Sequence, residues 1–372
     1  MINEKRLTEN FVELVSIDSP SFGERQIADY IKPQLLSLGF MVTEDDGGEK
    51  LGGNCGNIYG YLKGNLPGKP LLFCTHMDTV EPAIGKRAIV ESDGTIHSDG
   101  TTVLGADDFA GIASLLEAFR TVTEKGLPHR SIEVLLTVAE EVYDRGAEVF
   151  DFVKIQAEEA YVLDYSGEAG SAAYAAPTIL SFSLKIIGRA AHAGFAPEKG
   201  IHTIAVAAKA ISNINMGHVD ADTTANIGTI TSGTAANIVP DCCVISGEIR
   251  SYRHERALEE WEHIKHVFSA AAAEMNAALK FEVRCAIHAY ETPLTAPVIR
   301  HFQVACSSLG LPPKLTRTFG GSDNNLLAQH GIKGIVLACA MYDCHTRSEY
   351  TSVQELASTA NLVVQLITAN ES

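Results

Sequence analysis

The chain has 372 residues, a length that suits two domains. Hydrophobic residues make up 46% and charged residues 20%, which excludes an intrinsically disordered or collagen-like chain. The 29 basic and 46 acidic residues give a net charge of −17 without a lysine or arginine cluster, so we expect no nucleic-acid partner.

The N-terminal segment and the cysteines predict a cytoplasmic protein. Residues 1–6 lead directly into an amphipathic segment and lack the apolar core of a signal peptide. The longest apolar stretch, 334–341, is far shorter than the roughly 20 residues of a membrane helix. The eight cysteines form no C-x-x-C pair, and several lie in apolar runs. We therefore expect no membrane partner, reduced core cysteines and no structural thiolate zinc site.

The first 177 residues predict alternating helices and strands. Apolar residues at helical spacing predict a helix over 7–15. A second helix is expected to begin at Ser21, with Glu24 completing a capping box and Pro33 kinking or splitting it. Short apolar runs predict buried strands at 57–62, 71–74, 132–138 and 161–163, and a helix at 109–119. This is the pattern of an α/β sheet.

The next segment, 178–290, has a different pattern. Its predicted elements are a strand at 179–187, a helix at 200–214, strands at 226–232 and 242–250, a helix at 255–278 and a strand at 281–288. This βαββαβ order is typical of a ferredoxin-like α+β unit. The α/β pattern then resumes, with helices at 298–309, 324–330 and 353–369 and strands at 315–318 and 335–338. We expect one α/β domain, 1–177 and 291–372, interrupted by an inserted lid domain, 178–290.

Polar clusters follow the ends of predicted strands, where α/β sheets place their sites. They are THMD at 75–78, GADDFAG at 105–111, AEE at 139–141, LD at 163–164 and CHTRSE at 344–349. His76 and Asp78 are two apart in an extended segment, so one can ligate a metal while the other fixes the imidazole. Two histidines with several carboxylates are the donor set of a two-zinc hydrolytic site.

Each cluster taken alone has a simpler interpretation. The H-x-D motif can be a hydrogen-bonded histidine at a strand end. Asp107 and Asp108 can cap a helix or complement its dipole. Glu140 and Glu141 can lie in a solvated loop, although adjacent carboxylates repel unless a cation or a shared proton holds them. The combination at five places favours the metal site.

The series HMDTV, GADDFAG, AEE, LD and GGSDNN followed by CHTRSE resembles the co-catalytic zinc exopeptidases of the peptidase T (tripeptide aminopeptidase) group. Carboxypeptidase G-type enzymes and acetylornithine and succinyl-diaminopimelate deacylases are more distant relatives. The resemblance covers nearly the whole chain, including the insertion. It implies a zinc-exopeptidase-like catalytic domain with a central sheet flanked by helices, an inserted lid and dimerisation domain, a short-peptide substrate and a homodimer formed through the lid.

The resemblance also implies roles for individual residues. It makes His76 and Asp164 the ligands of one metal, Glu141 and His345 those of a second, and Asp107 the bridge between both. Asp78 would hold His76, and Glu140 would be the general base. The implied cofactors are two divalent ions, with zinc expected first and cobalt or manganese as alternatives. The Asp107–Asp108 peptide is a candidate cis bond, and Phe109 stands where the group often has lysine, which affects substrate detail more than metal binding.

Four residues in or near the insertion are candidates for substrate binding. His192, in GRAAHAG, resembles the lid histidine and would donate to the substrate carbonyl; a surface-loop residue is the alternative. Asn237 and Arg250 would grip a substrate carboxylate, although an ion pair with a neighbouring acid would also explain Arg250. Gly321, in GGSD, would let the backbone approach the substrate closely.

Three functions follow from these residues. The first is an exopeptidase that removes the N-terminal residue of short peptides, in which two cations activate a water and Glu140 transfers its proton. The second keeps the metal core but acts as a carboxypeptidase or an N-acyl amino acid deacylase. The third, a non-catalytic metal- or peptide-binding descendant, would lack the base or a ligand, whereas this sequence has Glu140 and all five ligands.

Overall fold

The computed structural model describes residues 2–369, which form two compact units. Unit 1 comprises Met1–Ala175, Glu291–Thr318 and Ser322–Ser372, and unit 2 comprises Ala176–Tyr290 and Phe319–Gly321. The segment Phe319–Gly321 thus belongs to unit 2, although the sequence pattern placed it with the α/β part. Within 2–369, no helix is both long and apolar enough to cross a bilayer.

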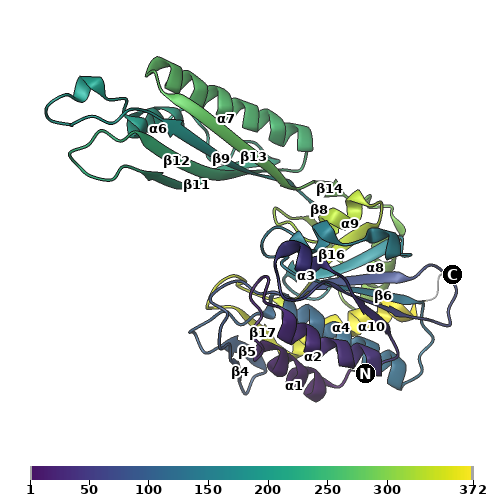
Figure 1. Cartoon of the computed structure of the whole chain (residues 1–372). Coiled ribbons are helices and arrows are strands. Elements are labelled where there is room, and N and C mark those ends of the chain that lie inside the picture. Colours follow the sequence, from purple (N-terminus) through teal and green to yellow (C-terminus); the bar gives the residue numbers. More distant parts are fainter. Residues whose placement is uncertain (1, 370–372) are drawn as a thin grey trace. The chain divides into compact units, whose positions relative to one another are not determined.

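A nine-stranded sheet forms the centre of unit 1 (Figure 1). Its order is β1 (Met41–Glu44), β2 (Ile58–Leu62), β6 (Ile132–Thr137), β3 (Leu71–His76), β7 (Glu159–Ser166), β16 (Lys333–Met341), β8 (Ser171–Ala176) and β14 (Tyr290–Glu291), with β15 (Lys314–Arg317) beside β8. The central strands β6, β3, β7 and β16 are parallel. Their carboxyl ends therefore lie at one edge of the sheet, where the polar clusters begin.

Both faces of the sheet are covered, which explains the continuous apolar runs of the central strands. On β3, Leu71 and Phe73 belong to the larger core, and Leu72 and Cys74 to the smaller one on the alternate side. The larger core contains residues of α1 (Glu4–Val15), α2 (Arg25–Ser37), α4 (Ala106–Glu124), α8 (Pro297–Ser308) and α10 (Val353–Thr368). The smaller includes Leu327 of α9 (Asn324–Gln329). Short elements complete the unit: α3 (Gly47–Leu51), α5 (Arg145–Val149) and the 3-10 turn η1 (Phe152–Lys154).

Unit 1 also contains a small second sheet that the sequence pattern did not predict. It consists of β17 (Tyr350–Ser352), β5 (Thr95–Ser98) and β4 (Ala88–Val90), in that order. Each strand has only three or four residues. β17 comes from a segment more than 200 residues away in sequence, so no local pattern could predict the pairing. Helix α2 continues through Pro33, so the proline does not split it.

Unit 2 is an antiparallel sheet with two helices. Its elements are β9 (Thr178–Ile187), the 3-10 turn η2 (Pro197–Lys199), α6 (Thr203–Ile211), β10 (Gly217–His218), β11 (Thr223–Ser232), β12 (Cys242–Ser251), α7 (His254–Glu274) and β13 (Ala278–Ile287). The strand order β10-β11-β12-β9-β13 contains the ferredoxin-like arrangement that the βαββαβ order predicts. Helix α7 ends four residues earlier than expected. Asn276 has a φ of +55° there and turns the chain into β13.

Candidate metal centre

The expected metal ligands of unit 1 lie where its strands end. His76 is the last residue of β3, and Asp164 lies near the end of the adjacent β7. Glu140 and Glu141 follow β6, the neighbour of β3 on its other side. Asp107 lies at the start of α4 with a non-helical φ of −82° and ψ of 98°. Parallel strands therefore bring together side chains that are far apart in the sequence.

Asp107 lies between the two histidines. Its Oδ1 is 3.0 Å from His76 Nε2, and its Oδ2 is 3.2 Å from His345 Nε2. His345 Nε2 is also 3.1 Å from Glu141 Oε2, and His76 Nε2 is 3.9 Å from Asp164 Oδ1. All five side chains named as ligands are thus gathered, with one carboxylate oxygen of Asp107 facing each histidine.

The donor atoms of this cluster fit metal ions. His76 Nδ1 donates to the backbone oxygen of Asp78 at 2.9 Å, which leaves the Nε2 lone pair directed at the carboxylate oxygens. Two lone pairs this close need a proton or a cation between them. Glu141 Oε1 is buried and has no hydrogen-bond partner, as expected of an oxygen that binds an ion.

The charges lead to the same conclusion. Burial, and next the carboxylate of Asp164, raise the pKa of Glu140 well above its ordinary value. Burial, and next Asp107, do the same to the pKa of Asp164. Hydrogen bonds to Asp107 and Glu141 raise the pKa of His345 to about 10. The buried carboxylates have too little positive charge around them to compensate their own, and two divalent ions would supply it.

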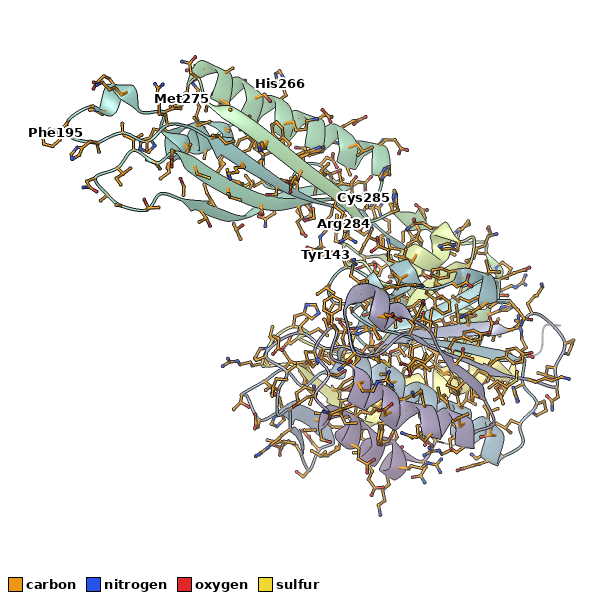
Figure 2. All side chains as sticks on the ribbon, in the orientation of Figure 1. Tyr143, Phe195, His266, Met275, Arg284 and Cys285 are labelled. Atoms are coloured by element: carbon orange, nitrogen blue, oxygen red, sulfur yellow. The ribbon has the colours of Figure 1, made fainter. Side chains whose placement is uncertain are left out.

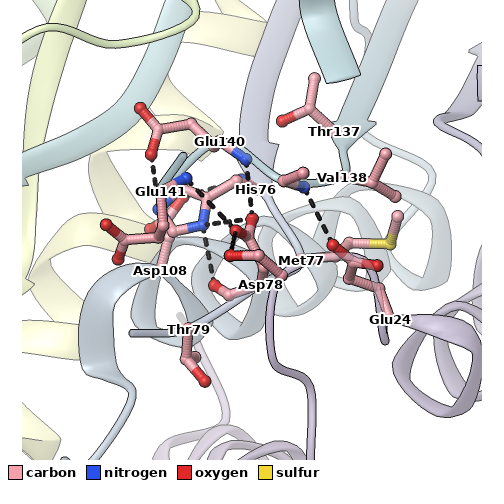
Figure 3. A network of polar contacts seen from close by, with 12 residues as sticks. Glu24, His76, Met77, Asp78, Thr79, Asp108, Thr137, Val138, Glu140 and Glu141 are labelled. Carbon is pink, nitrogen blue, oxygen red and sulfur yellow. Dashed lines mark hydrogen bonds and ion pairs between the residues drawn. The ribbon is translucent and has the colours of Figure 1, made fainter. Parts of the chain in front are cut away.

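Asp78 organises the segment that carries the glutamates (Figure 3). Its Oδ1 accepts a hydrogen bond from the Glu140 backbone N–H at 3.0 Å. Its Oδ2 accepts from the Glu141 N–H at 3.2 Å and from the Ser21 hydroxyl at 2.7 Å. The carboxylate is 3.5 Å from His76 Nδ1, so the histidine is held mainly by the Asp78 backbone.

The predicted capping box of Ser21 and Glu24 was wrong. Helix α2 begins at Arg25, and Glu24 makes no capping hydrogen bond. The buried Glu24 carboxylate instead accepts from the Phe22 N–H at 2.8 Å and from the Ala139 N–H at 2.9 Å, next to Glu140. The S-x-x-E pattern thus serves the site rather than the helix, because Ser21 and Glu24 bond to the distant Asp78 and Ala139.

We expect Glu24→Gln to change the pH dependence of stability. Burial, and next the charge of Asp78, raise the pKa of Glu24 from 4.5 to about 7. Between these values the folded chain holds a proton that the unfolded chain has lost, so the free energy of unfolding falls as pH rises. Ionisation costs the folded state about 3 kcal/mol above pH 7, at about 1.4 kcal/mol per pKa unit. Glutamine removes this cost.

Urea unfolding followed by circular dichroism, in a buffer containing a chelator, measures this effect from pH 4.5 to 8. The stability of Glu24→Gln relative to the wild type should rise across this range. Glu49→Gln, at an exposed carboxylate, serves as the control. A stability difference that does not change with pH would contradict the assignment.

Two further acids, Glu349 and Asp108, hold the segments around Asp107 through contacts that the sequence did not predict. Glu349 accepts from the Gly105 N–H at 2.7 Å and from the Asp107 N–H at 2.9 Å. Asp108 accepts from the His76 N–H at 3.3 Å and from the Thr75 hydroxyl. The Asp107–Asp108 peptide is cis, which confirms that expectation. Glu349 lay in the CHTRSE motif, but only its contacts identify what it holds.

Phe109, which replaces the group's usual lysine, lies close to a different lysine. Its ring is fully buried, and the Nζ of Lys86 lies 5.3 Å from the ring centroid. Lys86 is itself buried and donates to the backbone oxygens of Ile17 at 3.0 Å and Ala83 at 3.2 Å. A cation thus lies against the ring face of Phe109, in the geometry of a cation–π contact.

The four candidate substrate-binding residues all lie in unit 2. His192 and Asn237 are exposed and belong to adjoining segments, since the Ala193 N–H donates to the Asn237 backbone oxygen at 3.0 Å. The His192 ring lies against Phe195, and its Nδ1 accepts from the Gly194 N–H at 3.1 Å. The structure thus brings this pair together, in a loop of unit 2.

The other two residues have contacts that explain their chemistry without a ligand. Arg250 makes a two-point ion pair with Glu248, at 2.8 and 3.1 Å, and donates to the Phe319 backbone oxygen at 2.7 Å. A Cβ at Gly321 would lie 2.3 Å from Ile287 Cδ1, so a larger residue there would have to displace the end of that side chain. Their role in binding a substrate stays a prediction.

Comparison with known proteins agrees with both units. Residues 57–181 match the model of peptidase family M28, and residues 174–276 match the peptidase dimerisation domain. The chain is 40% identical to the uncharacterized protein YqjE of Bacillus subtilis, over 99% of both chains. It is 26% identical to a peptidase T of Clostridium perfringens, over 98% of both chains.

Two solved structures share the fold over nearly their whole length. A tripeptidase from Staphylococcus aureus is 36% identical, with a TM-score of 0.96 over 99% of this chain and 98% of that one. The aminopeptidase PepT from Bacillus cereus is 40% identical, with a TM-score of 0.92 over the same shares. The fold and the matches define a metallopeptidase. The chain belongs to the peptidase T-like group.

Proposed function

We propose that this protein is a metal-dependent aminopeptidase that removes the N-terminal residue of tripeptides. The names of its relatives, a tripeptidase, the aminopeptidase PepT and peptidase T, support this activity. The observation that carries the proposal is the position of Asp107 between the two histidines, with Glu140 beside them. This arrangement suits a pair of ions and leaves one glutamate for proton transfer.

We assign five residues to two divalent ions. His76 and Asp164 would hold one ion, Glu141 and His345 the other, and Asp107 both. Zinc is the ion we expect, because imidazole and carboxylate donors in a hydrolytic site suit it, and cobalt or manganese could replace it. When bound, the ions polarise the scissile carbonyl and lower the pKa of a water. The unpartnered Glu141 Oε1 supports this fit.

The chain's own residues supply the proton transfer. Glu140 is fixed at its backbone by Asp78, and its Oε2 lies 4.0 Å from His76 Nε2. It would take a proton from the attacking water and pass it to the leaving amine. Glu141 is bound to an ion in this scheme and cannot also move the proton, so the two adjacent glutamates have different roles.

A tripeptide panel tests the activity. The wild-type protein with Zn²⁺ should hydrolyse tripeptides with a free amino group and lose at least about a hundredfold in kcat/KM when that group is acetylated. One absent ion pair of about 3 kcal/mol accounts for such a loss. Product analysis should find the free N-terminal amino acid. Faster cleavage of the acetylated peptides, or release of the C-terminal residue, would identify the deacylase or carboxypeptidase instead.

Several finer assignments complete the proposal. We place the protein in the cytoplasm, supported by eight cysteines that are all free thiols. We propose a homodimer formed through unit 2, supported by the dimerisation-domain match. The substrate-binding candidates His192, Asn237, Arg250 and Gly321 belong to this unit too, and we keep them as contacts to the peptide.

A further inference from the structure

Unit 2 contains a second group of metal-ligand side chains, separate from the candidate metal centre. His254 is the first residue of α7, Cys285 lies on β13, labelled in Figure 2, and His288 follows the end of that strand. One ligand atom from each lies within 4.8 Å of the other two. The two imidazole rings have centroids 4.5 Å apart. All three residues are partly buried, so the group is accessible to an ion.

The backbone is shaped to bring Cys285 and His288 together. Side chains three residues apart on a regular strand point to opposite faces. The pairing of β13 with β9 shifts between Cys285 and Ile287, which leaves Ala286 as an extra residue. This bulge turns the following residues over, so that Cys285 and His288 share one side. A bulge that re-aims a side chain in this way is common at binding sites.

A buried hydroxyl orients the third side chain. Thr178 Oγ1 accepts a hydrogen bond from the Ala289 N–H at 2.9 Å and lies 3.2 Å from His254 Nδ1. Its remaining lone pair can accept the Nδ1 hydrogen, which leaves the Nε2 of His254 as a metal donor. Metal-binding histidines are typically fixed by such a hydrogen bond on the other ring nitrogen. Thr178 is fully buried, so water does not compete for this contact.

The donor set selects the kind of ion. Two imidazoles and one thiol suit Zn²⁺ or Co²⁺, whereas Mg²⁺ and Ca²⁺ require oxygen donors. The cysteine loses its proton on binding, so that one thiolate and two neutral imidazoles face a divalent charge. Three protein ligands leave one position of a tetrahedron for water. The site would tie the first turn of α7 to the end of β13.

We propose that His254, Cys285 and His288 form an additional zinc-class metal site in unit 2. Because it uses no residue of the candidate metal centre, it stands whether or not the proposed peptidase activity is correct. An ion held by both α7 and β13 would stabilise unit 2 against unfolding, with its fourth position left open to water. The protein would then bind one more ion than its active site requires.

Cobalt titration of the full-length, chelator-treated protein tests the site. Thiolate bound to Co²⁺ gives a charge-transfer absorption in the near ultraviolet, whereas the five ligands assigned in unit 1 offer only nitrogen and oxygen. We expect this absorption in the wild type, and its loss together with one equivalent of bound Co²⁺ in Cys285→Ser. Cys242→Ser, at another partly buried cysteine of unit 2, is the matched control and should keep both. Cys344→Ser should also keep them, which excludes the cysteine next to His345.

A second variant and a second measurement distinguish loss of the metal site from a folding defect in Cys285→Ser. His288→Ala should also bind one equivalent of Co²⁺ fewer than the wild type. Trp261 is the only tryptophan and packs in unit 2 against Phe182, so its fluorescence follows the unfolding of that unit. Zn²⁺ should raise the urea midpoint of this signal in the wild type and not in either variant. Absence of the absorption in the wild type, or its survival in Cys285→Ser, would overturn the proposal.

Discussion

Replacing Glu140 with alanine should lower kcat for tripeptide hydrolysis by about 10²–10⁴ while both metal ions stay bound. Glu140 is the carboxylate of the cluster that we assign to no ion, and its Oε2 lies 4.0 Å from His76 Nε2. Without it, the attacking water has no acceptor for its proton and the leaving amine has no donor. Because the base acts mainly in the transition state, KM should change little compared with kcat.

The measurement combines steady-state kinetics on a free tripeptide with metal analysis of the same sample. Glu148→Ala is the matched control, because this exposed glutamate lies on the same segment and forms an ion pair with Arg145. It should keep wild-type kinetics. Wild-type turnover by Glu140→Ala would refute the proposed mechanism, and loss of metal from that variant would make Glu140 a ligand instead.

The second large effect is expected for Asp107→Ala, which should abolish activity by weakening the binding of both ions. Asp107 places one oxygen 3.0 Å from His76 and the other 3.2 Å from His345, so no other side chain of the cluster can replace it. Its removal leaves each ion one ligand short and removes the charge between them. Metal affinity should fall by at least about a hundredfold, more than changes around ligands typically cause.

Isothermal titration of chelator-treated protein with Zn²⁺ tests this expectation. Asp99→Ala removes an exposed aspartate shortly before the same loop and should bind both ions normally. Circular dichroism should show that Asp107→Ala keeps its fold. If that variant still bound two ions with wild-type affinity, the bridging role of Asp107 would be wrong. The two predictions are distinguishable, because Glu140→Ala loses turnover with its metals in place.

The sequence predicted the main elements of both units because their signals are local. A strand covered on both faces must be apolar throughout, as at Leu71–His76, and an amphipathic helix must repeat its apolar residues every three or four positions. The short strands β4, β5 and β17 carry no such signal, because their pairing joins distant segments. The periodicity of apolar residues also could not predict the order of strands in the large sheet.

The residues of the candidate site likewise fall into those that the sequence could identify and those that only the structure identified. Residues that follow apolar strands could be recognised one by one, and the resemblance to peptidase T assigned them roles that the geometry supports. The supporting residues could not be found like this. Ser21 and Glu24 have the spacing of a capping box, yet they hold Asp78 and Ala139. Their local pattern favoured one set of partners, and the packed chain offered another.

By itself, the sequence determined which side chains could meet, because strand ends and the chemistry of each side chain can be recognised from short stretches of the chain. Only the tertiary structure decided how they meet: Asp107 between two histidines, Glu349 holding the loop, and a bulge that places Cys285 beside His288. The physical reason is that burial removes water as a partner. Each polar group must then bond to whatever the fold brings within reach, however distant in the chain.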